Sequence, residues 1–546
     1  MAILEVILIA LALVIALAAL ADRLQVPYPI LLLTGGIALG FIPGLPAISI
    51  DPSILFLLFI PPLVFSSGWR TSWRDFRANL WPISLLSVGL VLATIAVVAV
   101  VARLTIGGLT WPAAFVLGAV VSSTDPVAAT AIAERLHLPQ RIVTLLEGEG
   151  VGNDAASLVA YRSAVAATVT GIFVLPLTAL QVVLAVIGGI AIGVIVALVY
   201  DWIADHLHNA QAEVALTLVV PFAAYIPADR LGVSGVLAVL VTGILGGRRV
   251  YPDRTADTRL AATGFWESLN FVLNGLIFVL LGVYLPGILA GIRDLPAGLL
   301  ALYAAVVFLT LVLVRATWVF AMPYFPGRGG RLMRQRSPNP PWKAAVVVTW
   351  SGMRGADTLV IALALPLTIA SGAAFPDRAL IIFLTFCTIA MTLVGQGLTL
   401  PALIGQLGLR GDDTEEREEA KAHLAADRAA LARLDELLAA DGTSPGTQND
   451  EQDEGSERRA PDGRTRSGGE HLRGLYIQRL RRHTATADGA PDSAVEADAE
   501  AILRLRRDVL EAQRQAVIAL RDRGEIGDDA MRHVLRDLDL EEEGLE

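Results

Sequence analysis

The stretch LLEGEGVGNDAAS, residues 145–157, places three carboxyl groups, Glu147, Glu149 and Asp154, within otherwise apolar sequence. The residues on either side of it, IVT (142–144) and LVAY (158–161), suit a membrane helix. Ionisable side chains at membrane depth are costly, usually face protein or a water-filled cavity, and mark functional sites by default. The stretch therefore predicts a membrane-spanning fold with a functional site inside it.

The composition of the whole chain also indicates a membrane protein. The chain has 546 residues, of which 54% are hydrophobic and only 18% are charged, whereas soluble domains carry about 25% charged residues. Charge is uneven, because residues 411–546 carry a net −14 and the first 410 residues a net +4. The single cysteine, Cys387, excludes an intrachain disulfide and a cysteine-based metal site.

Thirteen apolar segments are candidates for spans, since about 20 apolar residues cross a bilayer. The N-terminus lacks a basic region, so the first segment reads as a helix and not as a cleaved signal peptide. The candidate segments are 2–21, 28–42, 51–67, 81–104, 111–134, 141–163, 171–203, 211–227, 231–247, 260–290, 297–322, 344–368 and 376–404.

Basic residues cluster in three loops, which this numbering places on one side of the membrane. They are Arg70, Arg74 and Arg77; Arg248, Arg249, Arg254 and Arg259; and Arg328, Arg331, Arg334, Arg336 and Lys343. The positive-inside rule makes that side cytoplasmic. We therefore expect a multi-pass protein of the bacterial inner membrane, with its N-terminus outside and its C-terminal tail in the cytoplasm.

The composition changes near the end of the last apolar segment. We expect a transmembrane domain over residues 1–405 and a cytosolic tail over 406–546. Helical spacing of Ala, Leu and charged residues predicts soluble helices at 412–440 and 496–523. A polar, Gly-rich linker at about 441–470 is predicted to be disordered. Both a regulatory or dimer-contacting tail and a solvated appendage stay open.

Segments 111–134 and 344–368 match each other in holding helix-breaking residues together with charge. Segment 111–134 holds Thr124, Asp125 and Pro126, and a proline removes a backbone donor and clashes with the preceding turn. Segment 344–368 holds Arg354 between two glycines, Gly352 and Gly355. Each is the fifth member of its half if segments 1–6 and 8–13 form inverted repeats, and paired interruptions at matching positions indicate a transporter site.

Depth along the helices separates the carboxylates of the opening stretch. Counting from Arg141 at about 1.5 Å per residue, Glu149 lies roughly 12 Å and Asp154 roughly 20 Å from the cytoplasmic side. Arg315 lies roughly 10 Å from that side by the same rise. Glu149 and Arg315 are therefore predicted to form a structural ion pair, whereas Asp154 is predicted to face a cavity near the midplane.

A carboxyl group in a cavity could hold either a proton or a small hard cation. Burial disfavours its charged form, so a partner is needed. Oxygens of Asp125, Asn153 and the carbonyls near Thr124 could complete a site for the cation. Binding of one ion would exclude the other, and this competition is the physical basis of an antiporter.

These residues resemble the cation:proton antiporter-1 family, which includes the bacterial Na+/H+ antiporters of the NhaP type. The resemblance covers residues 1–405 and rests on FIPPLVF (59–65), TDP (124–126), EGEGVGNDA (147–155), Arg315 and GMRGA (352–356). It implies an all-α, NhaA-like inverted-repeat fold of about 13 transmembrane helices with two crossed discontinuous helices. It also implies a homodimer, and exchange of one Na+ for one H+ without net charge movement.

The resemblance also implies roles for individual residues. Asp154 would bind the ion and the proton, with Asp125 as a second metal ligand and support from Thr124 and Asn153. Glu149 would pair with Arg315, and Pro126 and Arg354 would lie at the helix crossing. No cofactor and no nucleic acid are implied, only Na+ or another monovalent cation and H+ as transported partners, with a role in pH homeostasis.

Three positions depart from the family pattern or are unassigned by it. The family often has Ser where Gly150 stands, and many members have an acidic residue where this chain has Ser66. Asp357 adds a carboxylate next to the predicted crossing. These positions leave the preference among Na+, Li+ and K+ undetermined by the sequence.

Three alternatives remain at this stage. The first is a K+/H+ antiporter of the same fold. The second is an intramembrane aspartyl protease, which also needs two carboxylates, although Asp154 stands one position late for its GxGD motif. The third is a cation channel or receptor gated by the tail, against which the paired, titratable charges at a predicted helix crossing argue.

Overall fold

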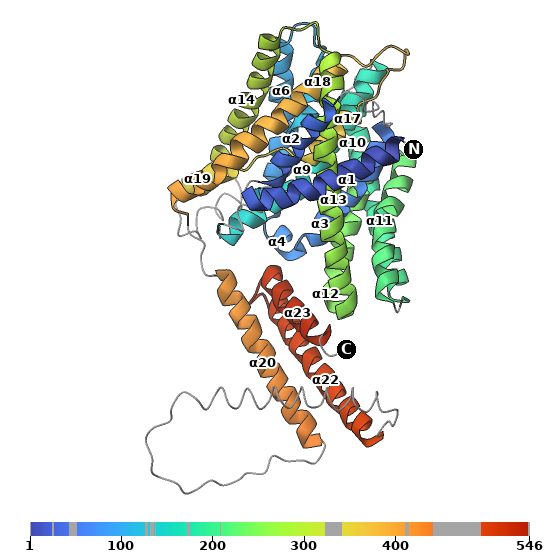
Figure 1. The fold of residues 1–546 in the computed structure, drawn as a ribbon, viewed down its shortest axis with the longest axis vertical. Coiled ribbons are helices and arrows are strands. Elements are labelled where there is room, and N and C mark those ends of the chain that lie inside the picture. Colours follow the sequence, from blue (N-terminus) through green and yellow to red (C-terminus); the bar gives the residue numbers. More distant parts are fainter. Residues whose placement is uncertain are drawn as a thin grey trace. The chain divides into compact units, whose positions relative to one another are not determined.

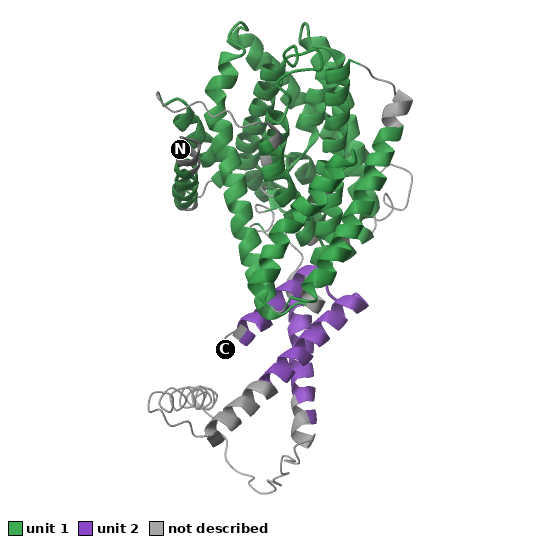
Figure 2. Ribbon diagram, turned by 90° about the vertical axis from the view of Figure 1, so that its right-hand side faces the viewer, with its two compact units in different colours: residues 1–415 green, residues 416–546 purple. Residues whose placement is uncertain are grey.

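The computed structural model describes the chain in two compact units, residues 1–415 and 416–546 (Figure 2). The residues described are 2–24, 27–42, 52–125, 129–130, 136, 138–171, 175–207, 209–322, 341–409, 414–440 and 493–543. Pro126 and the predicted disordered linker at about 441–470 lie outside these residues.

The described part of the first unit is helical, apart from one isolated antiparallel bridge between Thr368 and Ala374. Its helices are α1 (Ala2–Leu24), α2 (Tyr28–Gly40), α3 (Pro52–Arg70), α4 (Trp73–Ala78), α5 (Leu80–Ser84), α6 (Val91–Thr105), α7 (Trp111–Ser122), α9 (Gln140–Thr170), α10 (Leu175–Ala204), α11 (Ala210–Arg230), α12 (Gly235–Asp253), α13 (Ala256–Ala290), α14 (Ala297–Ala321), α16 (Pro341–Trp350), α17 (Ala356–Leu363), α18 (Arg378–Ala390) and α19 (Gly397–Leu407). Two π-helical turns, η1 (Leu85–Leu90) and η3 (Met391–Gln396), join α5 to α6 and α18 to α19.

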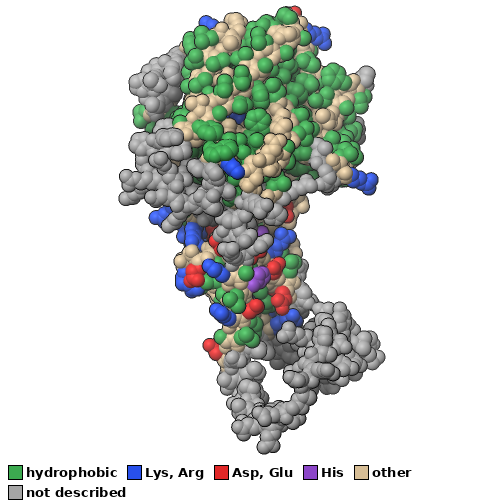
Figure 3. All heavy atoms as spheres, turned by 90° about the vertical axis from the view of Figure 1, so that its left-hand side faces the viewer, with side chains coloured by type: hydrophobic (Ala, Val, Ile, Leu, Met, Phe, Trp, Pro, Cys, Tyr) green, Lys and Arg blue, Asp and Glu red, His purple; other side chains and the backbone are tan. Residues whose placement is uncertain are grey.

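Six of the described helical stretches are long and apolar enough to cross a membrane. They are Leu80–Thr105, Leu180–Ala204, Ala210–Arg230, Ala256–Ala290, Ala297–Ala321 and Arg378–Leu407. Hydrophobic side chains cover most of the face of this unit seen in Figure 3. Exposing a large apolar surface to water is unfavourable, so a surface of this kind indicates contact with lipid. The unit is therefore that of a multi-pass membrane protein.

Two interruptions divide helices where the sequence predicts breaks. The helix α7 ends at Ser122, and Ser123 is extended, with φ −63° and ψ 137°. The helix α16 ends at Trp350, and α17 begins only at Ala356. The predicted breaks in segments 111–134 and 344–368 are confirmed.

Close backbone contacts pack the helices of this unit. The helices α2 and α13 lie side by side (Figure 1). A Cβ added to Gly282 would lie 2.2 Å from the backbone nitrogen of Ile37, and one added to Gly36 would lie 2.4 Å from the carbonyl oxygen of Val279. Small residues at such contacts let membrane helices approach closely, which replaces the missing hydrophobic drive between them.

The loops after α10 and after α12 lie at one end of the unit. Arg249 pairs with Asp201 at 3.2 Å, and Arg254 pairs with Asp205 at 3.0 Å. The predicted basic loop between segments 9 and 10 therefore meets the acidic loop between segments 7 and 8. These two ion pairs hold the end of α10 beside the end of α12.

The described residues of the second unit form the helices α20 (Thr414–Ala440), α22 (Ser493–Arg523) and α23 (Asp528–Glu543). Buried Leu and Val side chains line the contact of α22 and α23, with Val517, Val534 and Leu535 fully enclosed. Glu418 of α20 accepts a hydrogen bond at 2.7 Å from the backbone nitrogen of Gly527, between α22 and α23. This unit is thus a small bundle that has its own core.

Candidate functional site

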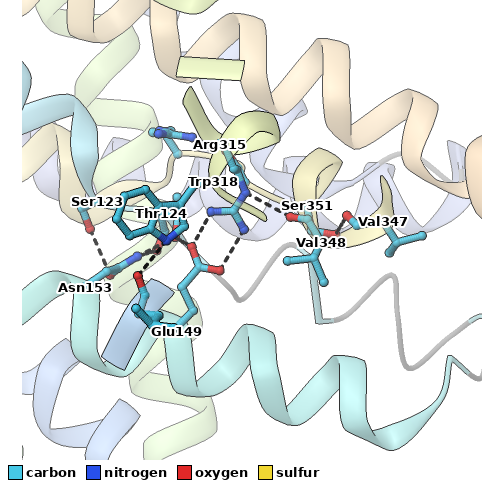
Figure 4. A network of polar contacts seen from close by, with 12 residues as sticks. Ser123, Thr124, Glu149, Asn153, Arg315, Trp318, Val347, Val348 and Ser351 are labelled. Atoms are coloured by element: carbon cyan, nitrogen blue, oxygen red, sulfur yellow. Dashed lines mark hydrogen bonds and ion pairs between the residues drawn. The ribbon is translucent and has the colours of Figure 1, made fainter. Parts of the chain in front are cut away.

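A buried ion pair joins α9 to α14. Both Glu149 and Arg315 have side chains 3% exposed, and Arg315 Nη2 donates to Glu149 Oε2 at 2.8 Å. A second bond runs from Arg315 Nη1 to Glu149 Oε1, and Nε donates to the carbonyl of Val348 at 3.0 Å (Figure 4). This two-pronged geometry holds an arginine and a carboxylate in a fixed orientation.

Polar contacts continue from this pair to the break after α7. Thr124 Oγ1 donates to Glu149 Oε1 at 3.0 Å. The amide of Asn153, one turn after Glu149, donates to the Thr124 hydroxyl and to its carbonyl, the latter at 3.1 Å. Glu149 and Asn153 share one face of α9 because they are four residues apart. The side chains of this face therefore satisfy backbone and side-chain groups of the interrupted segment.

Asp154 points to a different part of the same break. Its Oδ1 accepts a hydrogen bond from the Ser123 hydroxyl, and only 9% of its surface is exposed. Its side chain is also in hydrogen-bonding contact with that of Asp357, at the start of α17. Among the described residues, no arginine or lysine forms an ion pair with Asp154. In the described part of the chain, the Ser123 hydroxyl and not an ion pair therefore meets the charge of Asp154 when that charge is present.

The two interrupted segments meet directly. The backbone nitrogen of Asp125 donates to the carbonyl of Met353 at 2.8 Å. Arg354 Nε donates to the carbonyl of Val121 at 3.0 Å, and its Nη1 donates to the carbonyl of Gly352. A buried arginine thus satisfies backbone acceptors left open at both helix ends, which irregular backbone at membrane depth requires.

Gly355 is the point of closest approach between the two segments. A Cβ added there would lie 1.8 Å from Asp125 Oδ2. Any side chain at this position would displace the Asp125 carboxyl group or separate the segments. The sequence suggested that Gly355 breaks a helix, and the structure adds that the space beside it is filled by Asp125.

The structure brings together most of the predicted site residues and adds two. Thr124, Asp125, Asn153 and Asp154 lie with Arg354 where the two interrupted segments meet, which is called the crossing below, and Glu149 and Arg315 lie beside it. Pro126 is outside the described residues. The contacts of Ser123 and Asp357 with Asp154 were missed by the sequence interpretation, although the polar run Ser122–Thr124 and the unassigned acid after GMRGA were the available signals.

A helical membrane unit with two broken helices meeting at buried carboxylates defines a secondary transporter. Residues 9–405 match the family described as sodium/hydrogen exchanger, transmembrane. The chain therefore belongs to the sodium/hydrogen exchanger family, and it is a membrane transporter and not an enzyme. The family identification made from the sequence motifs is confirmed.

Similar proteins cover different shares of the chain. It is 36% identical over 394 residues to a sodium, potassium, lithium and rubidium/H+ antiporter of Bacillus pumilus, and the match covers 69% of this chain but 58% of that protein. It is 35% identical to an uncharacterised Na+/H+ exchanger of Mycobacterium tuberculosis, over 96% of this chain and 92% of the relative. The second match therefore extends into the tail.

The fold has a counterpart among solved structures. The sodium proton antiporter MjNhaP1 of Methanocaldococcus jannaschii superposes with a TM-score of 0.56 at 20% identity. The superposition covers 74% of this chain and 99% of that protein. At this identity the likeness concerns the fold alone, which is the helical architecture of the membrane unit.

Proposed function

We propose that this chain exchanges Na+ or Li+ for H+ across the bacterial inner membrane, with cation and proton competing for Asp154. The observation that carries the proposal is the position of Asp154, buried at the crossing and held by Ser123 without an ion pair to a described arginine or lysine. Burial disfavours an uncompensated carboxylate, so a proton or a cation must accompany it.

The neighbouring residues support this role of Asp154. Asp125, as a second cation ligand, and Thr124 and Asn153 would surround the ion, while Glu149 with Arg315 would fix the frame. The pair Glu149–Arg315 is internally neutral and does not need to exchange anything. One carboxyl group that alternates between one proton and one monovalent cation moves no net charge, so we infer electroneutral 1:1 exchange.

The proposal includes the architecture around the site. We infer about 13 spans in an NhaA-like inverted-repeat arrangement, in which the segments after α7 and α16 are the crossed interruptions. The N-terminus would lie outside, and residues 406–546 would form a cytoplasmic tail on a membrane domain of residues 1–405. A homodimer is the assembly that the family resemblance implies.

Proteoliposomes with a trapped pH dye test the activity. Adding Na+ to acid-loaded vesicles should cause proton efflux, and Asp154→Asn should abolish it while the purified protein keeps its melting temperature within a few degrees. Asp229→Asn, at an exposed ion pair on α11, is the matched control and should retain exchange. Absence of cation-dependent proton movement in the unmodified protein would refute the proposal.

An imposed membrane potential tests the stoichiometry separately. Electroneutral exchange should proceed at the same rate with and without a valinomycin-set K+ diffusion potential. A rate that follows the sign of the potential would show that the ratio differs from one to one.

K+/H+ exchange is the second candidate function. The relative of Bacillus pumilus that is 36% identical over 394 residues is named for sodium, potassium, lithium and rubidium. The same proteoliposomes distinguish the candidates, because exchange driven by K+ and not by Na+ would replace the first candidate with the second.

A further inference from the structure

A third acidic residue, Asp357, lies at the crossing beside Asp125 and Asp154. Asp357 is in the first turn of α17, two residues after Gly355. Its carboxyl group contacts that of Asp154, and Asp125 is close enough to repel both. Thr358, the next residue, donates to the carbonyl of Ser123 at 3.4 Å. The start of α17 is therefore fixed against the segment that holds Asp154.

The arginines of the crossing are occupied elsewhere. Arg315 is bound by Glu149, and Arg354 donates to the carbonyls of Val121 and Gly352. Neither Asp154 nor Asp357 has an ion pair with a described arginine or lysine. Two touching carboxylates repel each other strongly when both are ionised, so a positive species between them is the arrangement that removes the repulsion.

One oxygen of Asp357 is available to contact such a positive species. Asp357 Oδ1 is shielded from solvent and has no hydrogen-bond partner in the described parts of the chain. A buried acceptor left without a donor costs about 1–3 kcal/mol, and more if it is charged. A bound cation would satisfy this oxygen, since hard cations are held by carboxylate, carbonyl and hydroxyl oxygens.

The helices around the site explain why a ligand from α17 would be needed. Gly150 stands one turn before Asp154 on α9 and has no side chain to offer. A ligand oxygen on the side of Asp154 that Gly150 faces must therefore come from another helix. Asp357 reaches Asp154 from α17, whose N-terminal end favours a negative side chain in its first turn.

We propose that Asp357 is a direct ligand of the transported monovalent cation, which is held between the carboxylates of Asp154 and Asp357. The Ser123 hydroxyl supplies a further oxygen beside Asp154. This inference rests on the proposed function, because it concerns the same cation at the same site. It assigns part of the cation affinity and selectivity to a residue of the second broken helix.

Equilibrium binding of ²²Na+ to the purified, full-length protein tests the inference without requiring transport. Asp357→Asn keeps the size and one carbonyl oxygen but removes the charge, so the Kd for Na+ should rise by at least about tenfold. Asp377→Asn, at an acid in the turn before α18 and away from the crossing, is the matched control and should leave the Kd unchanged. An unchanged Kd in Asp357→Asn would overturn the inference.

A second variant covers the case in which Asp357→Asn does not fold. Asp357→Glu keeps the charge and moves the carboxylate by one methylene, which should change the ratio of Na+ to K+ affinity at least about threefold. A residue with only a structural role would lower the yield of folded protein and leave this ratio at the wild-type value, and that result would overturn the inference.

The transport assay separates this inference from the proposed function. Wild-type protein that binds ²²Na+ through Asp357 but moves no protons would refute exchange and retain the ligand. Wild-type protein that exchanges Na+ for H+, with an unchanged Kd in Asp357→Asn, would retain exchange and refute the ligand.

Discussion

Replacing Glu149 by Gln tests the idea that the ion pair with Arg315 holds the membrane unit together. Both side chains are 3% exposed, and Arg315 makes two of its three hydrogen bonds to Glu149. The variant keeps a carbonyl oxygen that can accept one bond but removes the negative charge. Arg315 would then be a buried cation with only the Val348 carbonyl and the new amide as partners.

The size of the effect follows from this burial. Breaking a buried pair by removing one partner costs about 3–5 kcal/mol, because the other charge is left uncompensated. Since Gln retains one acceptor, we expect about 3 kcal/mol, which lowers the ratio of folded to unfolded protein by more than about 100-fold. The melting temperature in detergent should fall by about 3–4 °C for a unit of this size.

The exposed pair Arg162–Asp229 provides a matched control. Its nitrogen and oxygen are 2.8 Å apart, as are Arg315 Nη2 and Glu149 Oε2, but its side chains are 37% and 49% exposed. Exposed pairs contribute about 0–1 kcal/mol, so Asp229→Asn should shift the melting temperature by little. If Glu149→Gln melts no lower than Asp229→Asn, the ion pair does not stabilise the unit and the reasoning from burial is wrong.

A double variant then identifies the origin of the loss. Glu149→Gln combined with Arg315→Gln removes both charges, so no buried cation remains uncompensated. Residues in one ion-pair network are coupled by about 0.5–3 kcal/mol, so the double variant should be more stable than the sum of the two single losses predicts. Strict additivity would show that the single variants act through packing and not through charge.

Two further predictions concern the crossing and the turn before α18. Gly355→Ala places a Cβ 1.8 Å from Asp125 Oδ2, so it should reduce the exchange rate at least about tenfold. Gly264→Ala is the control, because a Cβ there has nothing within 4 Å, and it should leave the exchange rate unchanged. Equal exchange rates in the two variants would refute the close approach of Gly355 and Asp125. Asp377 has a left-handed φ of 52°, and burial raises the pKa of its carboxyl group. The charged carboxylate is therefore less favourable in the folded state than in the unfolded state. This lowers the stability of the folded protein as the pH rises past the unfolded pKa. Asp377→Asn tolerates the same φ and should melt higher than wild type at pH 7 but not at pH 4; a gain that is equal at both pH values would show that the buried charge is not the cause.

The positions of the helix breaks could be predicted because they follow from single residues. The helix α7 ends at Ser122, four residues before Pro126 in the sequence, and a proline in a helix clashes with the carbonyl at that spacing. The break between α16 and α17 contains both Gly352 and Gly355. The π-helical turns η1 and η3 were not predicted, because one extra residue in a turn leaves no mark in an apolar sequence.

The contact that could be predicted at the site is the one that depends only on depth in the membrane. Glu149 and Arg315 lie at similar depths on two long helices, and the structure places them together. The partners of Asp154 were harder to predict, because they depend on how the two broken segments are rotated against each other. Ser123 and Asp357 reach Asp154 from irregular backbone and from a new helix start, whose directions are set by tertiary packing and not by helical periodicity.

Two of the carboxylates on α9, Glu149 and Asp154, contact adjacent residues of the segment that follows α7. Asn153, one turn after Glu149, donates to Thr124, and Glu149 accepts from the same residue, so the segment after α7 is tied to the Arg315 pair. Ser123 precedes Thr124 and donates to Asp154. The hydroxyl that contacts Asp154 therefore belongs to the residue next to Thr124, which is hydrogen-bonded to the Glu149–Arg315 ion pair. If Asp154 exchanges a proton for a cation, as proposed, an ion pair that stays buried and neutral would keep this hydroxyl in place during the exchange.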